Sequence, residues 1–389
     1  MLSTALGRQI RINEVERLTQ RGRRNLLLRC LTDPAPNLPS SFILKKIETK
    51  VYNPEDTASW ETMRFFKDWV GAQFLSTISR RSNHSPHCYG GDRKLGFSML
   101  EDLGTHSSLV EPLLAKDSNQ AEKTLLKYAT RLGQMHSDTI GRAAEFEALF
   151  HSISPTAQMS SLHMTSQAAR LPIQAANGLN QCLQNLQARL ESLGIQAESG
   201  LAQELASIVD AITNPGPFLA YVHADPCPDN EFDTGEELRL IDFEFGHFGH
   251  ALIDAAYPRM IFPTCWCAGR LPHSIISQME TLYRTELSRG CPEAQDDSLF
   301  ETALVKICGF CLLSTLIRHL EDALKRDRNW GIATVRQRVI ARLEAFIDTS
   351  EQFAQLPRLR GMSSNLLELL RQRWPNTPQL PLYPAFRDR

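Results

Sequence analysis

The sequence lacks the features that direct a chain to nucleic acid or to a repeat architecture. Its formal net charge is only −2 over 389 residues, which provides no general attraction to polyanions or membranes. No basic stripe with interleaved aromatic residues occurs, so a nucleic-acid interface is not expected. Internal repeats and low-complexity runs are absent from the sequence as well.

Signals for secretion and for membrane insertion are also missing. The first residues, MLSTALGRQIRI, are interrupted by Arg8 and Arg11 and do not form the apolar core of a signal peptide. The most apolar long stretch, Ile307 to Ile317, has eleven residues, which are too few to span a bilayer and suit a buried helix. We therefore expect a cytoplasmic protein without a membrane partner.

Cysteine usage points to the same compartment, because nine cysteines over this length form no disulfide framework. Cys265 and Cys267 have no second pair of Cys or His residues nearby at metal-ligand spacing. We therefore expect buried thiols in a reducing environment. With 42% hydrophobic and 22% charged residues, the composition is that of a soluble globular enzyme with two or three domain-sized units.

The stretch from Pro217 to Asp254 carries the polar residues that indicate a chemical function. The apolar run 218–222 predicts a short buried strand, and Pro226 and Pro228 break the segment that follows into a loop. A hairpin comes next, with its turn at 233–236 and a returning arm that ends at Ile241.

This order of elements brings Asp225, Asn230 and Asp242 to one end of the predicted hairpin. A carboxylate and an amide can hold a Mg²⁺ ion that keeps most of its waters and bridges nucleotide phosphates. A separate carboxylate is needed to orient an attacking hydroxyl and to accept its proton. The set therefore fits Mg²⁺-dependent phosphoryl transfer, whereas the alternative is a loop whose Asp and Asn side chains only cap turns.

These residues resemble the aminoglycoside phosphotransferase and choline kinase-like family, whose motif is His-Gly-Asp-x-x-x-x-Asn followed by an apolar run ending in Asp-Phe. Residues 223–230 read HADPCPDN, and Ile241-Asp242-Phe243 follows. The resemblance implies that Asp225 is the catalytic base, that His223 supports its loop, and that Asn230 and Asp242 bind Mg²⁺. It also implies that ATP or GTP supplies a phosphoryl group to a hydroxyl of a small molecule.

Two residues of the motif depart from the family pattern. Ala224 stands where the family has Gly, which removes a residue that readily adopts a positive φ. Cys227 replaces a common His or Phe, while Pro228 is the family's residue. Neither change removes the base or a metal ligand.

The resemblance implies an α+β, two-lobed protein kinase-like fold. Residues 1–102 would form a small β-rich nucleotide-binding lobe, and residues 103–389 a large, mainly helical lobe for catalysis and substrate binding. Apolar patterns predict strands at 15–18, 26–30 and 42–47, and helices at 61–78, 121–137, 179–193, 201–209, 275–287, 299–324, 334–352 and 363–374.

Two adjacent lysines, Lys45 and Lys46, lie near the end of the third predicted strand and point to its opposite faces. In the resembling family a lysine here neutralises the α- and β-phosphates, and the apolar run favours Lys45. The family pairs this lysine with a Glu on the next helix. The matching residue is Asp68, which is one methylene shorter, and Glu61 is the alternative.

Further contacts to the nucleotide are implied by the resemblance alone. Asn25 matches the end of the phosphate-covering loop, where Arg23 or Arg24 can meet the phosphate charge. Residues 99–104, MLEDLG, match the hinge between lobes. There the backbone of a segment including Glu101 and Leu103 reads the adenine edge, and Met99 or Leu100 packs on the adenine face.

Several residues around the motif are expected to have supporting roles. The resemblance implies that Asp254 buttresses the catalytic loop and that Glu244 reaches a second cation or the substrate. For His136, His247 and His250 we expect polar packing rather than catalysis.

The acceptor is not determined by the sequence, because an aminoglycoside, choline, a sugar or a hydroxy-amino acid would each present a hydroxyl to Asp225. Acidic residues gather near the hairpin tip and either favour a cationic acceptor or are charged because the tip is solvated: Glu231, Asp233, Glu236 and Glu237. The oligomeric state is not indicated either.

The alternative function is a pseudokinase-like scaffold or a protein-directed kinase. The shorter Asp68 and the single glycine in the phosphate loop favour this alternative. The intact Asp225, Asn230 and Asp242 argue against an inactive site, and no activation segment ending in Ala-Pro-Glu is present.

Overall fold

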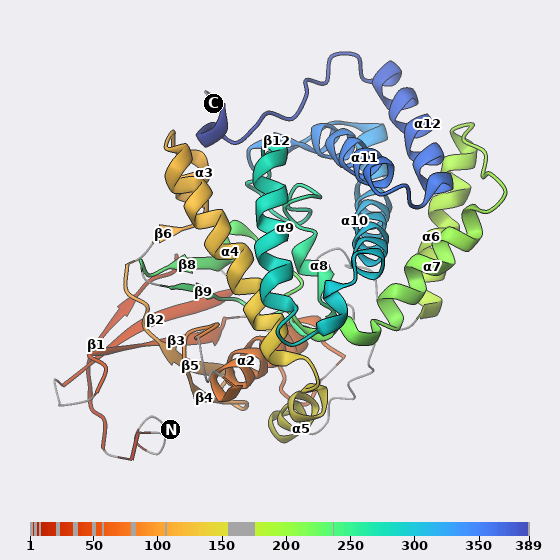
Figure 1. The fold of residues 1–389 in the computed structure, drawn as a ribbon. Coiled ribbons are helices and arrows are strands. Elements are labelled where there is room, and N and C mark those ends of the chain that lie inside the picture. The colour runs from red at the N-terminus through yellow and green to blue at the C-terminus, as the bar shows by residue number, and fades with distance from the viewer. Residues whose placement is uncertain are drawn as a thin grey trace. The chain divides into compact units, whose positions relative to one another are not determined.

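The computed structural model describes residues 3–387, apart from 4, 5, 8, 21–23, 34–37, 49–51, 57, 79–82, 106, 155–175 and 236. Arg23 and Glu236 therefore lie outside the described residues. The chain forms two compact units, which are described separately (Figure 1). Unit 1 comprises residues 1–107, 142–159 and 230–247, and unit 2 comprises 108–141, 160–229 and 248–389. The division into lobes at residue 102 stays a prediction.

Unit 1 contains a five-stranded antiparallel sheet in the order β1-β2-β3-β5-β4, so the predicted β-rich N-terminal part is confirmed. Its strands are β1 (Ile12–Arg17), β2 (Asn25–Thr32), β3 (Ser41–Ile47), β4 (Cys88–Asp92) and β5 (Phe97–Glu101). β1 is exposed along its whole length, and its charged side chains discourage pairing of this edge with another chain.

Two helices of unit 1 pack beside the sheet and on each other. α2 (Trp60–Ile78) lies against β4, where a Cβ added to Gly91 would come within 2.5 Å of the Trp69 ring. The sequence pattern did not predict α5 (Ala143–Ile153), which packs on α2 through the rings of Phe74 and Phe146, 5.4 Å apart. β8 (Glu231–Asp233) and β9 (Leu238–Leu240) form the predicted hairpin, and β6 is Ser107–Ser108.

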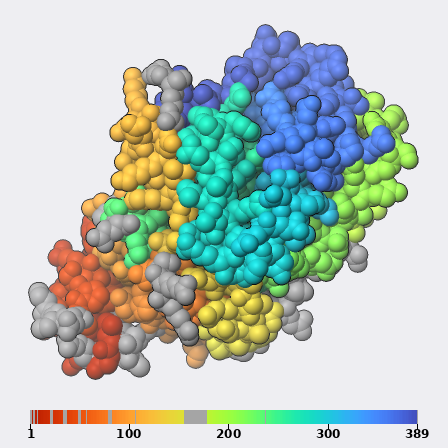
Figure 2. All heavy atoms as spheres, in the orientation of Figure 1, coloured from red at the N-terminus to blue at the C-terminus, as the bar shows by residue number. Residues whose placement is uncertain are grey.

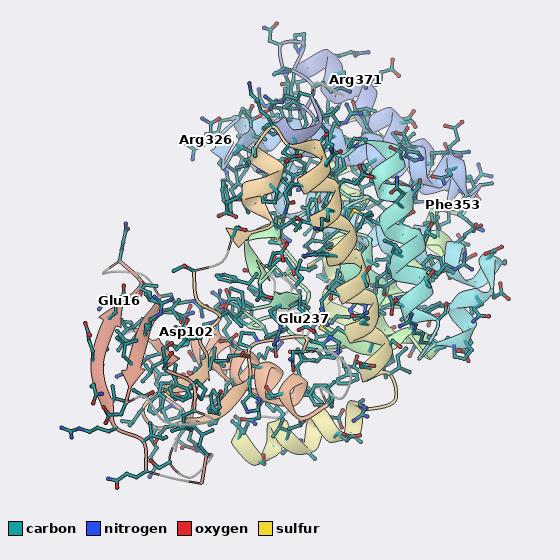
Figure 3. All side chains as sticks on the ribbon, turned by 60° about the vertical axis from the view of Figure 1, so that its left-hand side comes forward. Glu16, Asp102, Glu237, Arg326, Phe353 and Arg371 are labelled. Carbon is teal, nitrogen blue, oxygen red and sulfur yellow. A yellow bond between two sulfur atoms is a disulfide. The ribbon has the colours of Figure 1, made fainter. Side chains whose placement is uncertain are left out.

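Asp102, labelled in Figure 3, follows β5 and is hydrogen-bonded to β2 and β3. Its carboxylate accepts hydrogen bonds from Arg29 Nε and Ser41 Oγ, both at 2.7 Å, and from Gly104 N at 2.9 Å. Burial alone would raise the pKa of Asp102, but these donors outweigh it and the pKa is lowered. The Asp of the predicted hinge therefore has a structural role in unit 1.

Unit 2 is mainly helical, which confirms the expected α+β composition of the chain. Its helices are α3 (Val110–Leu114), α4 (Ser118–Thr139), α6 (Ala176–Ser192), α7 (Leu201–Thr213), α8 (Leu252–Ala255), α9 (His273–Leu287), α10 (Asp297–Lys325), α11 (Val335–Gln352) and α12 (Pro357–Arg373). α4 and α9 lie side by side in Figure 1. In Figure 2 the blue C-terminal helices α11 and α12 border the yellow-green helices α6 and α7.

Several of these helices begin at residues that satisfy their first backbone amides. Asp117 and Asp296 cap α4 and α10, and Thr334 forms a capping box with Gln337 at the start of α11. α12 begins at Pro357, earlier than its apolar pattern predicts, because proline is well suited to a first helical turn.

The apolar stretch 307–317 lies in α10, which is longer than the expected segment. With 29 residues, α10 is the one helix of the described chain that is long and apolar enough to cross a membrane. However, 72% of its most apolar window is buried within the structure, as expected for a core helix.

Short strands complete unit 2 and were not all predicted. β7 (Leu219–Val222) is the strand expected before the motif, and β10 (His247–His250) pairs with it. β11 (Asn329–Trp330) and β12 (Ala333–Thr334) form a two-residue ladder. Segments of two to four residues do not show a readable hydrophobic period, so β10, β11 and β12 gave no signal.

Two buried histidines of unit 2 make its stability depend on pH. Burial, with help from the charges of His136 and Lys306, lowers the pKa of His250 to about 3. Burial and neighbouring arginines lower the pKa of His319 to about 3 as well. Because an unfolded histidine has a pKa of about 6.5, the unfolded chain takes up these protons first as the pH falls. The free energy of unfolding should therefore decrease between about pH 6.5 and pH 3.

His319→Gln removes one group that takes up a proton on unfolding. We expect it to reduce the slope of the free energy of unfolding against pH by about 1.4 kcal/mol per pH unit. Urea unfolding of both proteins at pH 7, 6 and 5 measures the slope. His273→Gln, at an exposed position, serves as the control and should leave it unchanged. Equal slopes for the native chain and His319→Gln would contradict the assignment.

Candidate active site

In unit 1, one lysine forms ion pairs with two carboxylates that are far apart in the sequence. Lys45 Nζ lies 2.7 Å from Asp68 Oδ2 and 2.6 Å from Asp242 Oδ1. Burial lowers the pKa of Lys45, but the two carboxylates more than reverse this effect and raise it above its usual value. The ammonium group therefore remains charged and connects β3, α2 and the end of the β8–β9 hairpin.

The strand register explains why Lys45 rather than Lys46 occupies this position. Lys45 stands opposite Leu27 and Ser98, whereas Lys46 is on the other face and is exposed. The helix carboxylate on Lys45 comes from Asp68, although its side chain is shorter than the Glu of the family pattern. Glu61, the alternative, instead lies 3.5 Å from Arg24.

Asn230 and Asp242 are brought together by the hairpin that separates them. Ile241 N donates to Asn230 O at 3.0 Å, just beyond the paired residues Glu231 and Leu240. Asp242 then leaves the hairpin with φ +68°, a left-handed conformation that Asp tolerates better than most residues. This turn coincides with the contact between its carboxylate and Lys45.

An amide oxygen and a carboxylate oxygen at the end of one hairpin suit a hard divalent cation. No group of three His, Cys, Asp or Glu side chains able to hold a metal occurs among the described residues. Two oxygen donors of this kind could hold an ion that retains several waters, as Mg²⁺ does.

Glu244 is engaged with two arginines of unit 1. Its buried carboxylate contacts Arg24, just before β2, and Arg64 on α2. The Arg64 guanidinium also lies over the Phe245 ring, 5.1 Å from its centroid. The expected contact of Glu244 with a second cation or the substrate stays a prediction, since its charge is neutralised here by Arg24 and Arg64.

Residues expected near the nucleotide base occupy different faces of the sheet. Met99 is 3% exposed and packs with Phe42 on the face opposite to Lys45. Leu100 pairs with Ile43 and shares the face of Lys45, so the register favours Leu100 over Met99 for a nucleotide contact.

The other three predicted nucleotide contacts are placed as follows. Asn25 is the first residue of β2, opposite Ile47. The Glu101 carboxylate accepts a hydrogen bond from His87 N at 3.0 Å, and Leu103 is half-buried after β5. None of these contacts identifies a ligand, so their nucleotide role stays a prediction.

In unit 2, the loop that follows β7 is held by one buried carboxylate. Asp254 Oδ2 accepts from His223 N at 2.7 Å, and Asp254 Oδ1 accepts from Ala224 N at 2.8 Å. His136 Nε2 lies 3.2 Å from Asp254 Oδ2, and its Nδ1 lies 2.8 Å from the Tyr283 hydroxyl. Asp254 therefore buttresses the loop, and His136 contacts Asp254.

The backbone of this loop keeps a left-handed residue even though glycine is absent. Ala224 has φ +62° and is fully buried, and its carbonyl accepts a hydrogen bond from the Tyr257 hydroxyl at 2.9 Å. His223 is also fully buried. A left-handed conformation at an alanine costs about 1–2 kcal/mol.

Asp225, the proposed base, is 5% exposed and has two neighbours that the sequence did not indicate. The Thr264 hydroxyl donates to Asp225 Oδ1, and Cys227 Sγ lies 3.1 Å from the same oxygen. Thr264 carries no motif and lies 39 residues away, so no sequence signal could have identified it.

Cys227 and Cys265 form a disulfide with Cα atoms 5.5 Å apart. The expectation of a free buried thiol was therefore wrong for Cys265, although Cys267 is free and buried as expected. The two partners are separated by 38 residues, and nothing in that spacing indicates a pair.

No protein-family model and no curated protein matches the sequence. Among solved structures, the chain is similar to a choline/ethanolamine kinase family protein from Mesorhizobium loti, with 15% identity and a TM-score of 0.44 over 90% of this chain and 92% of that chain. A choline kinase from Cryptosporidium parvum gives 13% identity and a TM-score of 0.45 over 92% and 93%.

An amicoumacin kinase solved in complex with AMP-PNP and Ca²⁺ gives 12% identity and a TM-score of 0.42 over 90% of this chain and 88% of that chain. The similarity to small-molecule kinases thus extends over nearly the whole chain at low identity.

Replacing Ala224 with Gly should stabilise the chain by about 0.5–1 kcal/mol, because relief of the left-handed strain exceeds the added entropy of unfolding. Urea unfolding measures the change. Ala220→Gly, at an equally buried position in β7, is the matched control and should destabilise instead. A loss of stability in both variants would contradict the proposed strain.

Proposed function

We propose that this chain is a Mg²⁺-dependent phosphotransferase that moves the γ-phosphoryl group of ATP or GTP to a hydroxyl of a small molecule. The observation that carries the proposal is the contact of Lys45 with both Asp68 and Asp242. In kinase-like sites a strand lysine paired with a helix acid and an Asp that binds Mg²⁺ must both be in place, and Lys45, Asp68 and Asp242 supply these residue types together.

Lys45 is suited to the α- and β-phosphates, because Asp68 holds its ammonium group in place while leaving its positive charge available. Asn230 and Asp242 would hold Mg²⁺, which neutralises charge on the phosphate oxygens when bound. Arg24, just before β2, is paired with Glu61 and Glu244, so its charge is already balanced within unit 1.

Asp225 is proposed as the base on the strength of its motif and its burial. The acceptor hydroxyl gives its proton to the Asp225 carboxylate as its oxygen forms a bond to the γ-phosphorus. The bond between that phosphorus and the β–γ bridging oxygen breaks, and ADP or GDP leaves. Thr264 and the backbone bonds to Asp254 fix the orientation of the carboxylate.

Two observations weigh against the alternatives of an inactive scaffold and a cationic acceptor. The shorter Asp68 still reaches Lys45, so it gives no support to an inactive scaffold. The acidic hairpin gives little support to a cationic acceptor, because Glu231 is fully buried and Glu237 lies 3.0 Å from Arg239. We therefore propose a small hydroxylated acceptor without assigning its charge.

Nucleotide binding is expected to depend on Mg²⁺ through Asp242. At 100 times its Kd, a Mg²⁺–nucleotide complex should stabilise the native chain by about 2.7 kcal/mol, which thermal unfolding with and without Mg²⁺ can detect. Asp242→Ala should abolish the part of the shift that needs Mg²⁺.

Asp68→Ala is the matched control, since it also removes a carboxylate from Lys45 but not a metal ligand. It should weaken binding while leaving the Mg²⁺ dependence in place. The same loss of Mg²⁺ dependence in both variants would contradict the role of Asp242.

Phosphoryl transfer should require the Asp225 carboxylate. Asp225→Asn is expected to lower turnover by about 10²–10⁴-fold, because a positioned base contributes that much. The test is ADP release from Mg²⁺–ATP during a screen of hydroxylated acceptors. Asp229→Asn, in the same loop, keeps an acceptor for the Trp266 indole and should retain activity. Near-native turnover by Asp225→Asn would overturn the proposed base.

A further inference from the structure

In unit 2, three alternate residues of the loop that contains the proposed base, Asp225, Cys227 and Asp229, contact a second segment, residues 264–266. The Thr264 hydroxyl donates to Asp225, Cys265 is bonded to Cys227, and Trp266 Nε1 donates to Asp229 Oδ2 at 2.8 Å. We refer to residues 264–266 as the clamp segment. Only the central link of the three is covalent.

Two buried arginines of α11 hold the clamp segment and the residues just before it. Arg338 donates to the carbonyls of Cys265 and Trp266 at 2.6 and 2.7 Å. Arg342 donates to the carbonyls of Ile261 and Phe262, both of which have positive φ. The clamp segment is therefore held in place. If the two segments move apart, the loop that contains Asp225 is the part that moves.

The oxidation state of the central link changes the groups that surround Asp225. Cys227 Sγ lies 3.1 Å from Asp225 Oδ1 and 3.2 Å from Thr264 Oγ1. A thiol at this position donates a hydrogen bond to the carboxylate, whereas a disulfide sulfur has no hydrogen to donate. Two unbonded sulfurs also cannot stay at bonding distance, so reduction displaces Cys227, two residues from the base.

We propose that Cys227 and Cys265 are a redox modification site that controls the proposed base, an inference that rests on the proposed function of Asp225. In the disulfide form, Asp225 keeps its hydrogen bond with Thr264, and phosphoryl transfer is faster. In the dithiol form, the Cys227 thiol competes with the Thr264 hydroxyl for Asp225 Oδ1, and phosphoryl transfer is slower.

Oxidation by a small-molecule disulfide balances without any other reagent. One cysteine thiolate attacks the oxidant to give a mixed disulfide and releases one thiol. The other cysteine thiolate then displaces the second thiol, so the Cys227–Cys265 bond forms. The oxidant's S–S bond is reduced, and the two protein protons pass to the released thiols. Cys227 is 4% exposed and Cys265 is 1% exposed, so exchange should take minutes to hours.

Cys267 provides an internal control for this proposal. It is two residues beyond Cys265 and fully buried, but it is a free thiol. Cys267→Ser therefore changes a buried sulfur in the same segment without removing the link. Cys265→Ser removes the link and leaves Cys227 as a thiol.

The first experiment equilibrates the full chain in buffers of oxidised and reduced glutathione, quenches with acid, alkylates free thiols and detects the Cys227–Cys265 peptide pair by mass spectrometry. We expect the pair in the native chain and in Cys267→Ser, its loss under strong reduction, and its absence in Cys265→Ser. Absence of the pair in the native chain under every oxidising buffer would overturn the proposal.

The second experiment measures phosphotransfer in the same samples. Reduction of the native chain and the Cys265→Ser change should each lower turnover by about 3- to 10-fold, because small displacements of a base are costly. Cys267→Ser should behave like the native chain. Equal turnover of the oxidised and reduced forms would overturn the control of Asp225.

The two experiments separate this proposal from the function on which it rests. A peptide pair that forms and is lost normally, without phosphotransfer in any form, would contradict the proposed function and leave the redox site intact. Thermal unfolding of each variant checks that a lower rate does not result from unfolding. Reduction of the native chain tests the effect of the disulfide on the rate without any substitution.

Discussion

The charge of Lys45 is the constraint on which the arrangement of unit 1 depends. A partly buried ammonium group is stable only with compensating negative charge, and here Asp68 and Asp242 supply it at 2.7 and 2.6 Å. The ion pair with Asp68 holds α2 against β3, and the ion pair with Asp242 holds the end of the β8–β9 hairpin against the same strand. The predicted phosphate ligand and the predicted metal ligand are thereby placed together.

Unit 2 depends on a comparable need to satisfy buried polar groups. Asp254 receives two backbone amides from the loop after β7, while Arg338 and Arg342 direct their donors to carbonyls of residues 261–266. Burial lowers the pKa of Arg338 to about 10, which shows how strongly the interior disfavours its charge. Such networks hold Asp225 rigidly because each member would be costly to leave unpaired.

Much of the site could be predicted because its residues are close in sequence or have a fixed periodicity. Residues 223–230 form a continuous motif, and the alternation of a strand separates Lys45 from Lys46. The position of Asp68 followed from matching one helix end. In each case a local pattern determined which side chain faces the site.

The rest could not be predicted because it depends on contacts between distant segments. Thr264 and Cys265 meet the loop across about forty residues of intervening chain, and neither carries a motif. The face occupied by Met99 follows from the pairing of β3 with β5, which apolar alternation does not specify. α5 was missed, although Phe146 and Phe150 are its buried face, because the pattern is short.

Direct detection of the phosphorylated product by ³¹P NMR tests the central claim most directly. The full chain would be incubated with Mg²⁺, ATP and pooled amino alcohols, amino sugars and other hydroxylated small molecules. We predict a phosphate monoester resonance that grows in step with ADP and is absent with Asp225→Asn and Asp242→Ala. ADP formation with inorganic phosphate as the sole partner product, unchanged in both variants, would contradict phosphoryl transfer at this site.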